Sequence, residues 1–394
     1  MKYINFGKVD KRYFIPIFDG VIMLFYYYFL ENFPKSEIIS QNPFIVNIYF
    51  SIGIIFAFIP HLILKYRIKK STNNNMNKAN TASKLNIDLI YEDISENFSS
   101  KKFRYLLLSS VGSFLQILLF NLFSNLCVYN MWFFDIILIS FISHLFLKTK
   151  IYRHQYFSMI IIIIFGFGLN IIEYFQLDEE ENKINPFGII MKFCSEFFFS
   201  LIVVISKYIM EKNYCSPYEF LMWDGIITIF FQIIALIVIN IIGPTISDVK
   251  YPDNFFEYFA NYNIYDFIIT LVIIIVAFGY NILLFLTCDI FTPFHILIPV
   301  IIEESYFFVG MKGNLVLNIL RIIIFILIVF MFLVFIKVIE INIYNLSYNT
   351  KKNIEIRSKR EPFIDMNYIM NPDEDIKEND DNSLSTNSMN NNTN

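Results

Sequence analysis

The sequence predicts an all-α polytopic membrane protein with about ten transmembrane helices. Apolar residues make up 56% of its 394 residues and charged residues only 17%, whereas soluble chains average about 25% charged residues. The apolar residues form blocks of about 18 to 27 residues, and an α-helix needs about 20 residues to cross about 30 Å of hydrocarbon. This pattern argues against a water-soluble globular protein.

Hydropathy and helix-end residues place the expected spans along the chain. They are Tyr13–Phe33, Pro43–Leu64, Phe103–Phe123, Leu126–Leu147, Gln155–Phe175, Pro186–Met210, Pro217–Ile242, Ile264–Cys288, Thr292–Val309 and Asn314–Val338. Pro43, Pro186 and Pro217 stand in first turns, where proline is tolerated because those N–H groups have no intrahelical partner. The first block runs past Val21 into Tyr26–Tyr28, so we expect a retained helix and not a signal peptide.

Lys and Arg divide unequally between the two sets of loops. With an even number of spans, both termini lie on one side. The loops and helix ends on that side carry 25 of the 31 Lys and Arg residues, and the opposite loops carry only Lys35, Lys183, Lys250 and Lys312. Because basic loops stay in the cytosol, both termini are predicted to be cytosolic.

The spans divide the chain into four parts. Residues 1–12 are expected to be a cytosolic N-terminus, and residues 13–180 a first group of five helices with a polar cytosolic loop at 67–102. Residues 181–340 hold five more helices. Residues 341–394 form a cytosolic tail rich in Asn, Ser and Asp, which cannot bury a core and is predicted to be largely disordered.

Charged residues inside the spans are the most informative feature, because a charge at the bilayer centre costs about 2.5 to 3.5 kcal/mol on insertion scales. Asp135 is expected about nine residues into its helix, facing the bundle interior. It either lines a solute pathway or makes a structural hydrogen bond between helices. Lys192 and Glu196 are four residues apart on one helix face. They form a structural ion pair or contact a solute.

A polar stripe occurs in the ninth expected span. His295, Pro299, Glu303 and Tyr306 are spaced four, four and three residues apart, which places them on one face of an α-helix, with Glu304 rotated by about 100°. Such a stripe indicates a cavity wall, and Pro299 frees a backbone carbonyl where the helix can bend. For His295 alone, a hydrogen-bonded packing role is favoured over proton relay.

Other polar residues in the spans give weaker indications. Asp19 and Asp224 lie near helix ends, where a hydrated rim position explains them, and Arg321 is close enough to its helix end to extend to the surface. Tyr280 and Asn281 add neutral hydrogen-bonding groups. The residues predicted to line a solute pathway are Asp135, Lys192, Glu196, Tyr280, Asn281, His295, Glu303 and Tyr306.

The sequence carries no recognisable catalytic motif. It has no Gly-rich phosphate loop, no His-Glu-x-x-His motif and no nucleophile elbow, and its four cysteines lack metal-ligand spacing. We therefore expect a protein that is not an enzyme and that uses no cofactor, metal ion or nucleic acid. Without an ATPase domain, any transport is expected to be exchange, facilitated or coupled to an ion gradient.

Five short segments carry a family resemblance. Phe146 to His154 is a short basic turn that ends a helix, and the Ile- and Gly-rich segment Ile160 to Gly168 follows it. The second half has the turn segments Lys207 to Lys212 and Ser216 to Glu219, and then Leu297 to Ile301. Together these segments resemble the drug/metabolite transporter superfamily, in particular its nucleotide-sugar-transporter-like branch (solute carrier family 35-like, EamA-like), over roughly residues 13–340.

The resemblance implies two inverted five-helix repeats, residues 13–180 and 181–340, with a site at their interface. It implies a secondary-active or exchange transporter that moves a small polar or charged metabolite by alternating access, coupled to a proton or a counter-substrate. The competing interpretation is a non-transporting receptor or scaffold that uses the cytosolic loop and tail. By analogy with the family, we expect a multi-pass protein that resides in an endomembrane, such as that of the Golgi or the vacuole, in preference to the plasma membrane. A homodimer is compatible with the sequence.

Overall fold

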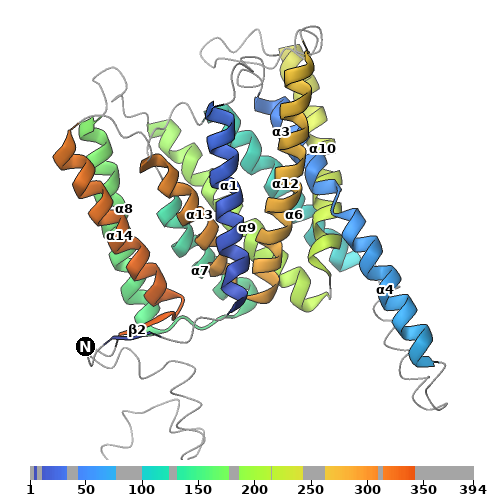
Figure 1. The fold of residues 1–394 in the computed structure, drawn as a ribbon, viewed down its shortest axis with the longest axis horizontal. Helices are drawn as coiled ribbons and strands as arrows, with labels where there is room; N and C mark the ends of the chain where they lie inside the picture. Colours follow the sequence, from blue (N-terminus) through green and yellow to red (C-terminus); the bar gives the residue numbers. More distant parts are fainter. Residues whose placement is uncertain are drawn as a thin grey trace, which may run out of the picture.

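The computed structural model describes residues 4–6, 11–32, 43–76, 100–123, 131–176, 186–213, 215–242, 262–308 and 314–341. These residues are almost entirely helical (Figure 1). The elements are β1 (Ile4–Phe6), η1 (Lys11–Tyr13), α1 (Phe14–Asn32), α3 (Pro43–Ile55), α4 (Phe58–Met76), α6 (Ser100–Phe123), η3 (Trp132–Phe134), α7 (Asp135–Leu147), α8 (Arg153–Gln176), α9 (Pro186–Lys212), α10 (Pro217–Ile242), α12 (Ile264–Ile290), η5 (Pro293–Ile296), α13 (Leu297–Glu304), η6 (Ser305–Phe308), α14 (Leu315–Phe335) and β2 (Ile339–Ile341). Most of the predicted N-terminus and all but the first residue of the predicted tail lie outside the described residues.

Within the described ranges, seven helical stretches are long and apolar enough to cross a membrane. They are Ile45–Arg67, Lys102–Phe120, Arg153–Gln176, Pro186–Lys212, Pro217–Val238, Ile264–Ile290 and Leu315–Phe335, and Trp132–Leu147 is a shorter apolar helix. Large apolar side chains such as Ile275, which is 62% exposed, stand on their outward faces. Lipid accommodates such surfaces, whereas water disfavours them. The chain is therefore compatible with the predicted multi-pass membrane protein, while the number of ten spans is not confirmed.

Three helix starts agree with the sequence prediction to the residue. α3, α9 and α10 begin at Pro43, Pro186 and Pro217. In α10, Ser216 precedes the proline and accepts a hydrogen bond from the Glu219 backbone N–H at 3.1 Å. Proline at the first position removes one N–H of the first turn and the serine N-cap satisfies another, so the local sequence favours this boundary.

The second expected span is broken into α3 and α4. Phe56 and Ala57 form a turn whose N–H groups donate to the carbonyls of Gly53 and Ile54 at 3.1 and 3.0 Å. Pro60 explains the break, because it has no N–H to donate to the Phe56 carbonyl and its ring crowds that carbonyl. α4 then continues to Met76, inside the segment predicted to be a loop, and projects away from the other helices (Figure 1).

The ninth expected span is a succession of short helical turns and not one α-helix. A 3-10 turn, η5, precedes α13, and another, η6, follows it. Pro299 cannot donate a hydrogen bond to the His295 carbonyl, which accounts for the tighter turn at η5. The predicted single stripe is therefore wrong in detail, because His295, Glu303 and Tyr306 belong to three different elements.

The described helices pack in a defined set of pairs. α6 packs on α9, α12 on α3, α10 on both α3 and α6, α7 on α9, and α1 on both α12 and α13. α8 and α14 pack together at one edge of the bundle (Figure 1). The core between these helices includes the fully buried side chains Phe133, Ile139, Ile205, Phe220 and Phe335.

Hydrogen bonds between polar side chains join several of these helix pairs. Ser51 on α3 donates to Gln232 on α10 at 3.1 Å, and Lys102 on α6 contacts Glu219 on α10 at 2.6 Å. The Gln176 amide on α8 donates to Asn318 on α14 at 2.6 Å. Such contacts hold helices together where apolar burial adds little because lipid is equally apolar.

The two ends of the folded chain meet in a small antiparallel sheet. Ile4 pairs with Ile341, and Phe6 with Ile339. The chain reaches β2 by reversing direction at Lys337, whose φ is 65° and whose Nζ lies 4.3 Å from the centre of the Tyr152 ring. The segment before α1 is thereby fixed to the segment after α14.

Lys148 ends α7 in the left-handed region, with φ 52°, and its N–H donates to the Ser143 carbonyl. A residue with a Cβ carries a cost there that glycine avoids. We expect Lys148→Gly to raise the free energy of unfolding by about 1 kcal/mol, measured by denaturation in detergent. The neighbouring variant Lys150→Gly, outside the left-handed region, should not stabilise the protein. If Lys148→Gly lowers stability, the charge at the helix end outweighs the backbone effect.

Candidate functional site

A cluster of charged side chains lies where α7 meets α9. Ser200 Oγ donates to Asp135 Oδ1 at 3.3 Å, and the Asp135 carboxyl lies within hydrogen-bonding range of the Glu196 carboxyl. Lys192 Nζ lies 3.3 Å from Glu196 Oε1 and 4.9 Å from the centre of the Phe120 ring. An ionised carboxylate only accepts hydrogen bonds, so a bond between the two carboxyls requires a proton on one of them. Asp135, Lys192, Glu196 and Ser200 form the α7–α9 cluster.

The spacing of residues on α9 and the start of α7 create the α7–α9 cluster. Lys192, Glu196 and Ser200 are four residues apart and share one face of α9. Asp135 is the first residue of α7 and only 1% exposed. The predicted burial of Asp135 and the predicted Lys192–Glu196 pair are confirmed. The position nine residues into a helix is wrong, because α7 begins at Asp135, directly after the 3-10 turn η3.

A second pair of carboxyl groups lies where α1 meets α13. Asp19 is 0% exposed, and neither of its carboxylate oxygens has a hydrogen-bond partner among the described residues. Glu303 on α13 acts on Asp19 electrostatically, and Glu303 Oε1 is likewise buried without a hydrogen bond in the described part of the chain. These two residues form the Asp19–Glu303 pair. The predicted hydrated rim position of Asp19 is wrong, because α13 covers it.

Close packing beside the Asp19–Glu303 pair depends on Gly20. A Cβ at this position would lie 2.7 Å from Ile302 Cβ, which is closer than van der Waals contact. The backbone of α1 therefore approaches α13 directly, one residue away from each carboxyl group.

Asp224 is also buried, at 5% exposed, which contradicts its predicted rim position. It lies on α10 and accepts hydrogen bonds from Ser113 Oγ on α6 at 3.2 and 3.3 Å. Its carboxylate oxygens thus have donors, unlike those of Asp19. We interpret Asp224 as a structural residue that joins α6 to α10.

Tyrosines surround the Asp19–Glu303 pair. Tyr280 on α12 and Tyr27 on α1 are both within electrostatic range of Glu303. The Tyr306 ring stacks on the Tyr27 ring with 5.9 Å between centres. The structure therefore brings Tyr280, Glu303 and Tyr306 of the predicted pathway to the same region, around α1 and α13.

Two residues of the predicted pathway, Asn281 and His295, form hydrogen bonds within the fold and do not join either group of carboxyl residues. The Asn281 amide donates to the Ala277 carbonyl one turn earlier on α12, at 2.8 Å. The two ring nitrogens of His295 lie 3.1 Å from Tyr13 Oη and 2.9 Å from Thr292 Oγ1. The two His295 contacts join η1 to the turn between α12 and η5, in line with the packing role favoured for His295.

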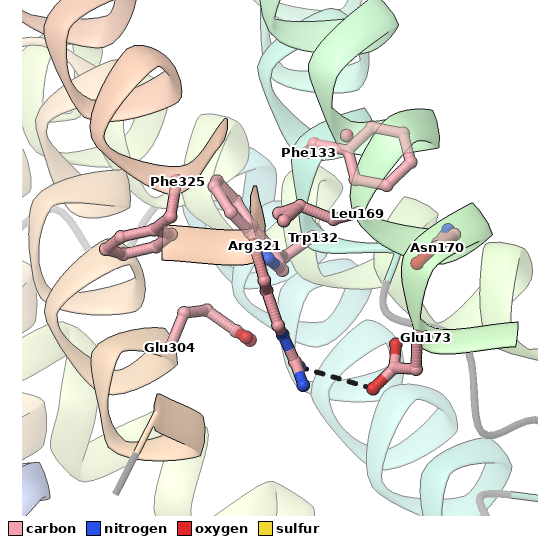
Figure 2. A pocket seen from close by; sticks show the side chains of 9 residues that line it. Trp132, Phe133, Leu169, Asn170, Glu173, Glu304, Arg321 and Phe325 are labelled. Atoms are coloured by element: carbon pink, nitrogen blue, oxygen red, sulfur yellow. Dashed lines mark hydrogen bonds and ion pairs between the residues drawn. The ribbon is translucent and has the colours of Figure 1, made fainter. Parts of the chain in front are cut away.

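A small cavity of about 20 Å³ lies between η3, α8, α13 and α14 (Figure 2). Arg321 Nη2 lies 3.4 Å from Glu173 Oε1 across this cavity, and Glu304 and Asn170 also line it. The volume suits a water molecule and not a metabolite. Arg321 extends into the bundle toward Glu173, 148 residues away in sequence, and not to the surface as its position near a helix end suggested.

No protein-family model matches the chain, and no curated protein is similar to it. Two helix pairs, α7 with α9 and α1 with α13, each bring together one buried aspartate and one partly buried glutamate, and among the described residues the first pair has a lysine and a serine donor beside them. The α7–α9 cluster can bind an ionic or hydrogen-bonding solute, and the Asp19–Glu303 pair can bind a positive charge.

The turn between α9 and α10 is packed tightly. Cys215 is buried there, and burial, reinforced by the nearby Glu219 carboxylate, raises the pKa of its thiol above the ordinary value. The thiol therefore stays protonated at neutral pH, and a protonated buried thiol is a poor nucleophile. Cys215 is a packing residue.

Proposed function

We propose that the chain is a secondary carrier that moves a small polar or charged solute across a membrane by alternating access, with the α7–α9 cluster as its solute site. The observation that carries the proposal is Asp135, buried between two helices with Glu196, Lys192 and Ser200 around it. Charges inside a membrane protein are expensive, and those that persist mark solute or ion pathways. A network with both signs of charge offers a polar solute contacts that replace its water.

The proposal includes ten helices arranged as two inverted repeats. The first repeat would hold α1, α3–α4, α6, α7 and α8, and the second α9, α10, α12, α13 and α14. In this arrangement the counterparts are α1 and α9, α3 and α10, α6 and α12, α7 and α13, and α8 and α14. If each helix is replaced by its counterpart, the α6–α9 contact becomes the α12–α1 contact, α12–α3 becomes α6–α10, and α1–α13 becomes α9–α7. The α8–α14 and α3–α10 contacts become themselves. Each of these contacts occurs in the bundle, which supports the repeat, and in that arrangement the α7–α9 cluster would lie beside the interface of the two halves.

The symmetric packing also supports the resemblance to the drug/metabolite transporter superfamily, which we propose as the family of this chain. α7 and α13, which are counterparts, both follow a 3-10 turn, and both carry a buried carboxyl residue that faces the first helix of the other half. The unequal distribution of Lys and Arg supports cytosolic termini. An endomembrane location and coupling to either a proton or a counter-substrate complete the proposal.

Uptake into proteoliposomes tests the proposal. The purified protein should accumulate one class of solute saturably when nucleotide sugars, amino acids, thiamine and organic cations are screened. Asp135→Asn should lower that uptake by about tenfold or more, because one charge-assisted hydrogen bond of about 1.4 kcal/mol or more is lost. Asp224→Asn is the matched control, since it neutralises another buried carboxyl that accepts from serine, and it should keep uptake above half of the unsubstituted level.

Two outcomes would contradict the proposal. If monodisperse, folded protein moves none of these solutes, the receptor or scaffold interpretation replaces transport. If uptake occurs and Asp135→Asn leaves it unchanged, the solute site lies elsewhere and the α7–α9 cluster is structural.

A further inference from the structure

Asp19 differs from the other acidic groups inside the bundle that are described above, because each of those has a hydrogen-bond donor or a cation beside it. Asp135 accepts a hydrogen bond from Ser200, and Asp224 accepts one from Ser113. Glu196 forms an ion pair with Lys192, and Glu173 forms one with Arg321. Asp19 has no hydrogen-bond donor on either oxygen within the described residues. A fully buried carboxyl group without a donor therefore needs another explanation.

Among the described residues, the ionisable groups that interact with the pair add no positive charge. These groups interact electrostatically with the carboxyl groups of the pair. They are Glu304 on α13, Tyr280 on α12, and Tyr27, which lies two turns beyond Asp19 on α1. All of these groups are acidic or neutral. Two neighbouring carboxylates cannot both stay ionised in such surroundings, because a buried unpaired charge costs several kcal/mol.

The ligand that neutralises the pair must be small. α1 and α13 meet at Gly20 and Ile302, the residues next in sequence to Asp19 and Glu303, and this contact leaves no room for a solute between the two helices at that point. Hard metal cations need about six oxygen ligands. The described residues contain no group of three or more His, Cys, Asp or Glu side chains that could hold a metal ion. A proton needs only one carboxylate oxygen.

We propose that the Asp19–Glu303 pair is the proton-binding site of this carrier and couples proton movement to movement of the solute. The inference rests on the proposed function and extends it, because it assigns the coupling ion and separates its site from the solute site. α1 and α13 belong to different halves of the proposed repeat. With one proton on the pair, the two helices pack as observed. Loss of that proton to an aqueous compartment leaves two carboxylates that repel each other, which favours separation of the two halves.

Infrared spectroscopy tests proton binding without any transport. A protonated buried carboxyl gives its own C=O stretching band, and the difference spectrum between the unsubstituted protein and Asp19→Asn should contain that band at neutral pH. Glu303→Gln provides a second variant. Both substitutions mimic the neutral carboxyl in shape, so the protein should fold. Asp224→Asn, whose carboxylate has serine donors, should not remove the band.

Proteoliposomes test the coupling. An inward proton gradient should stimulate solute uptake by the unsubstituted protein at least fivefold, whereas an inward sodium gradient should not. Asp19→Asn should lose this stimulation but keep solute exchange across the membrane without a gradient, because its α7–α9 cluster is intact.

The outcomes separate the inference from the function on which it rests. If the band difference is missing, or if Asp19→Asn responds to a proton gradient like the unsubstituted protein, the proton site is wrong even though solute moves. Stimulation by sodium instead of protons overturns it as well. If the band is present but no solute moves under any condition, the proton site stands and the proposed carrier function fails.

Discussion

Lys192→Met is expected to destabilise the protein by about 3 kcal/mol, the lower end for buried ion pairs, because removing one partner of this partly buried pair leaves the other charge uncompensated. Lys192 is the cation of the α7–α9 cluster, 3.3 Å from Glu196 Oε1, and it acts on Asp135 too. Methionine keeps the length and the apolar contact with Phe120 but not the charge. The free energy of unfolding in detergent measures the effect, and solute uptake should fall with it.

A second substitution shows whether the lost charge is the cause. Lys192→Met combined with Glu196→Leu removes both members of the pair, so no uncompensated charge remains on α9, and most of the stability should return. The matched control is Lys212→Met at the exposed end of the same helix, which should cost less than about 1 kcal/mol. If Lys192→Met costs no more than Lys212→Met, the pair is solvated and contributes little.

Local rules explain which parts of this structure the sequence predicted correctly. Pro43, Pro186 and Pro217 fix helix starts because proline acts through its own φ and its missing N–H. The Lys192–Glu196 pair follows from four-residue spacing, which a helix converts into proximity without help from other elements. These predictions needed no knowledge of how helices pack.

Errors arose where packing decides the outcome. Asp19 was assigned to a hydrated rim from its distance to a helix end, but that distance does not reveal that α13 covers it. The partner of Arg321 is Glu173, 148 residues away, and no local pattern joins the two. Hydropathy placed Asp135 inside a helix because the residues before it are as apolar as those after it. The start of α7 depends on turn η3 instead, which packs Phe133 against Gly166 on α8.

Gly53→Leu is expected to separate α3 from α12 and to cost about 3 kcal/mol or more, the upper range for overpacked cores. A Cβ at this position would lie 2.5 Å from the Ile274 carbonyl oxygen and 2.8 Å from Ala277 Cβ. The first of these atoms is backbone, so no side-chain rotation relieves the clash and the helices must move apart. Close approach through small residues is how helices associate in membranes, and the contact adjoins the apolar cluster that contains Ile45 and Ile273.

Two further glycine variants make this prediction specific. Gly53→Ala introduces the clashing Cβ alone and should cost less than leucine but remain measurable. Gly279→Ala is the control on α12, because its Cβ would lie 4.0 Å from the nearest side-chain atom, Ile22 Cδ1. Thermal unfolding, with size-exclusion chromatography as the readout, ranks the unfolding temperatures of the three variants. If Gly53→Leu unfolds at the same temperature as Gly279→Ala, α3 and α12 do not pack as closely as described, and the counterpart contact between α6 and α10 loses its support as a repeat.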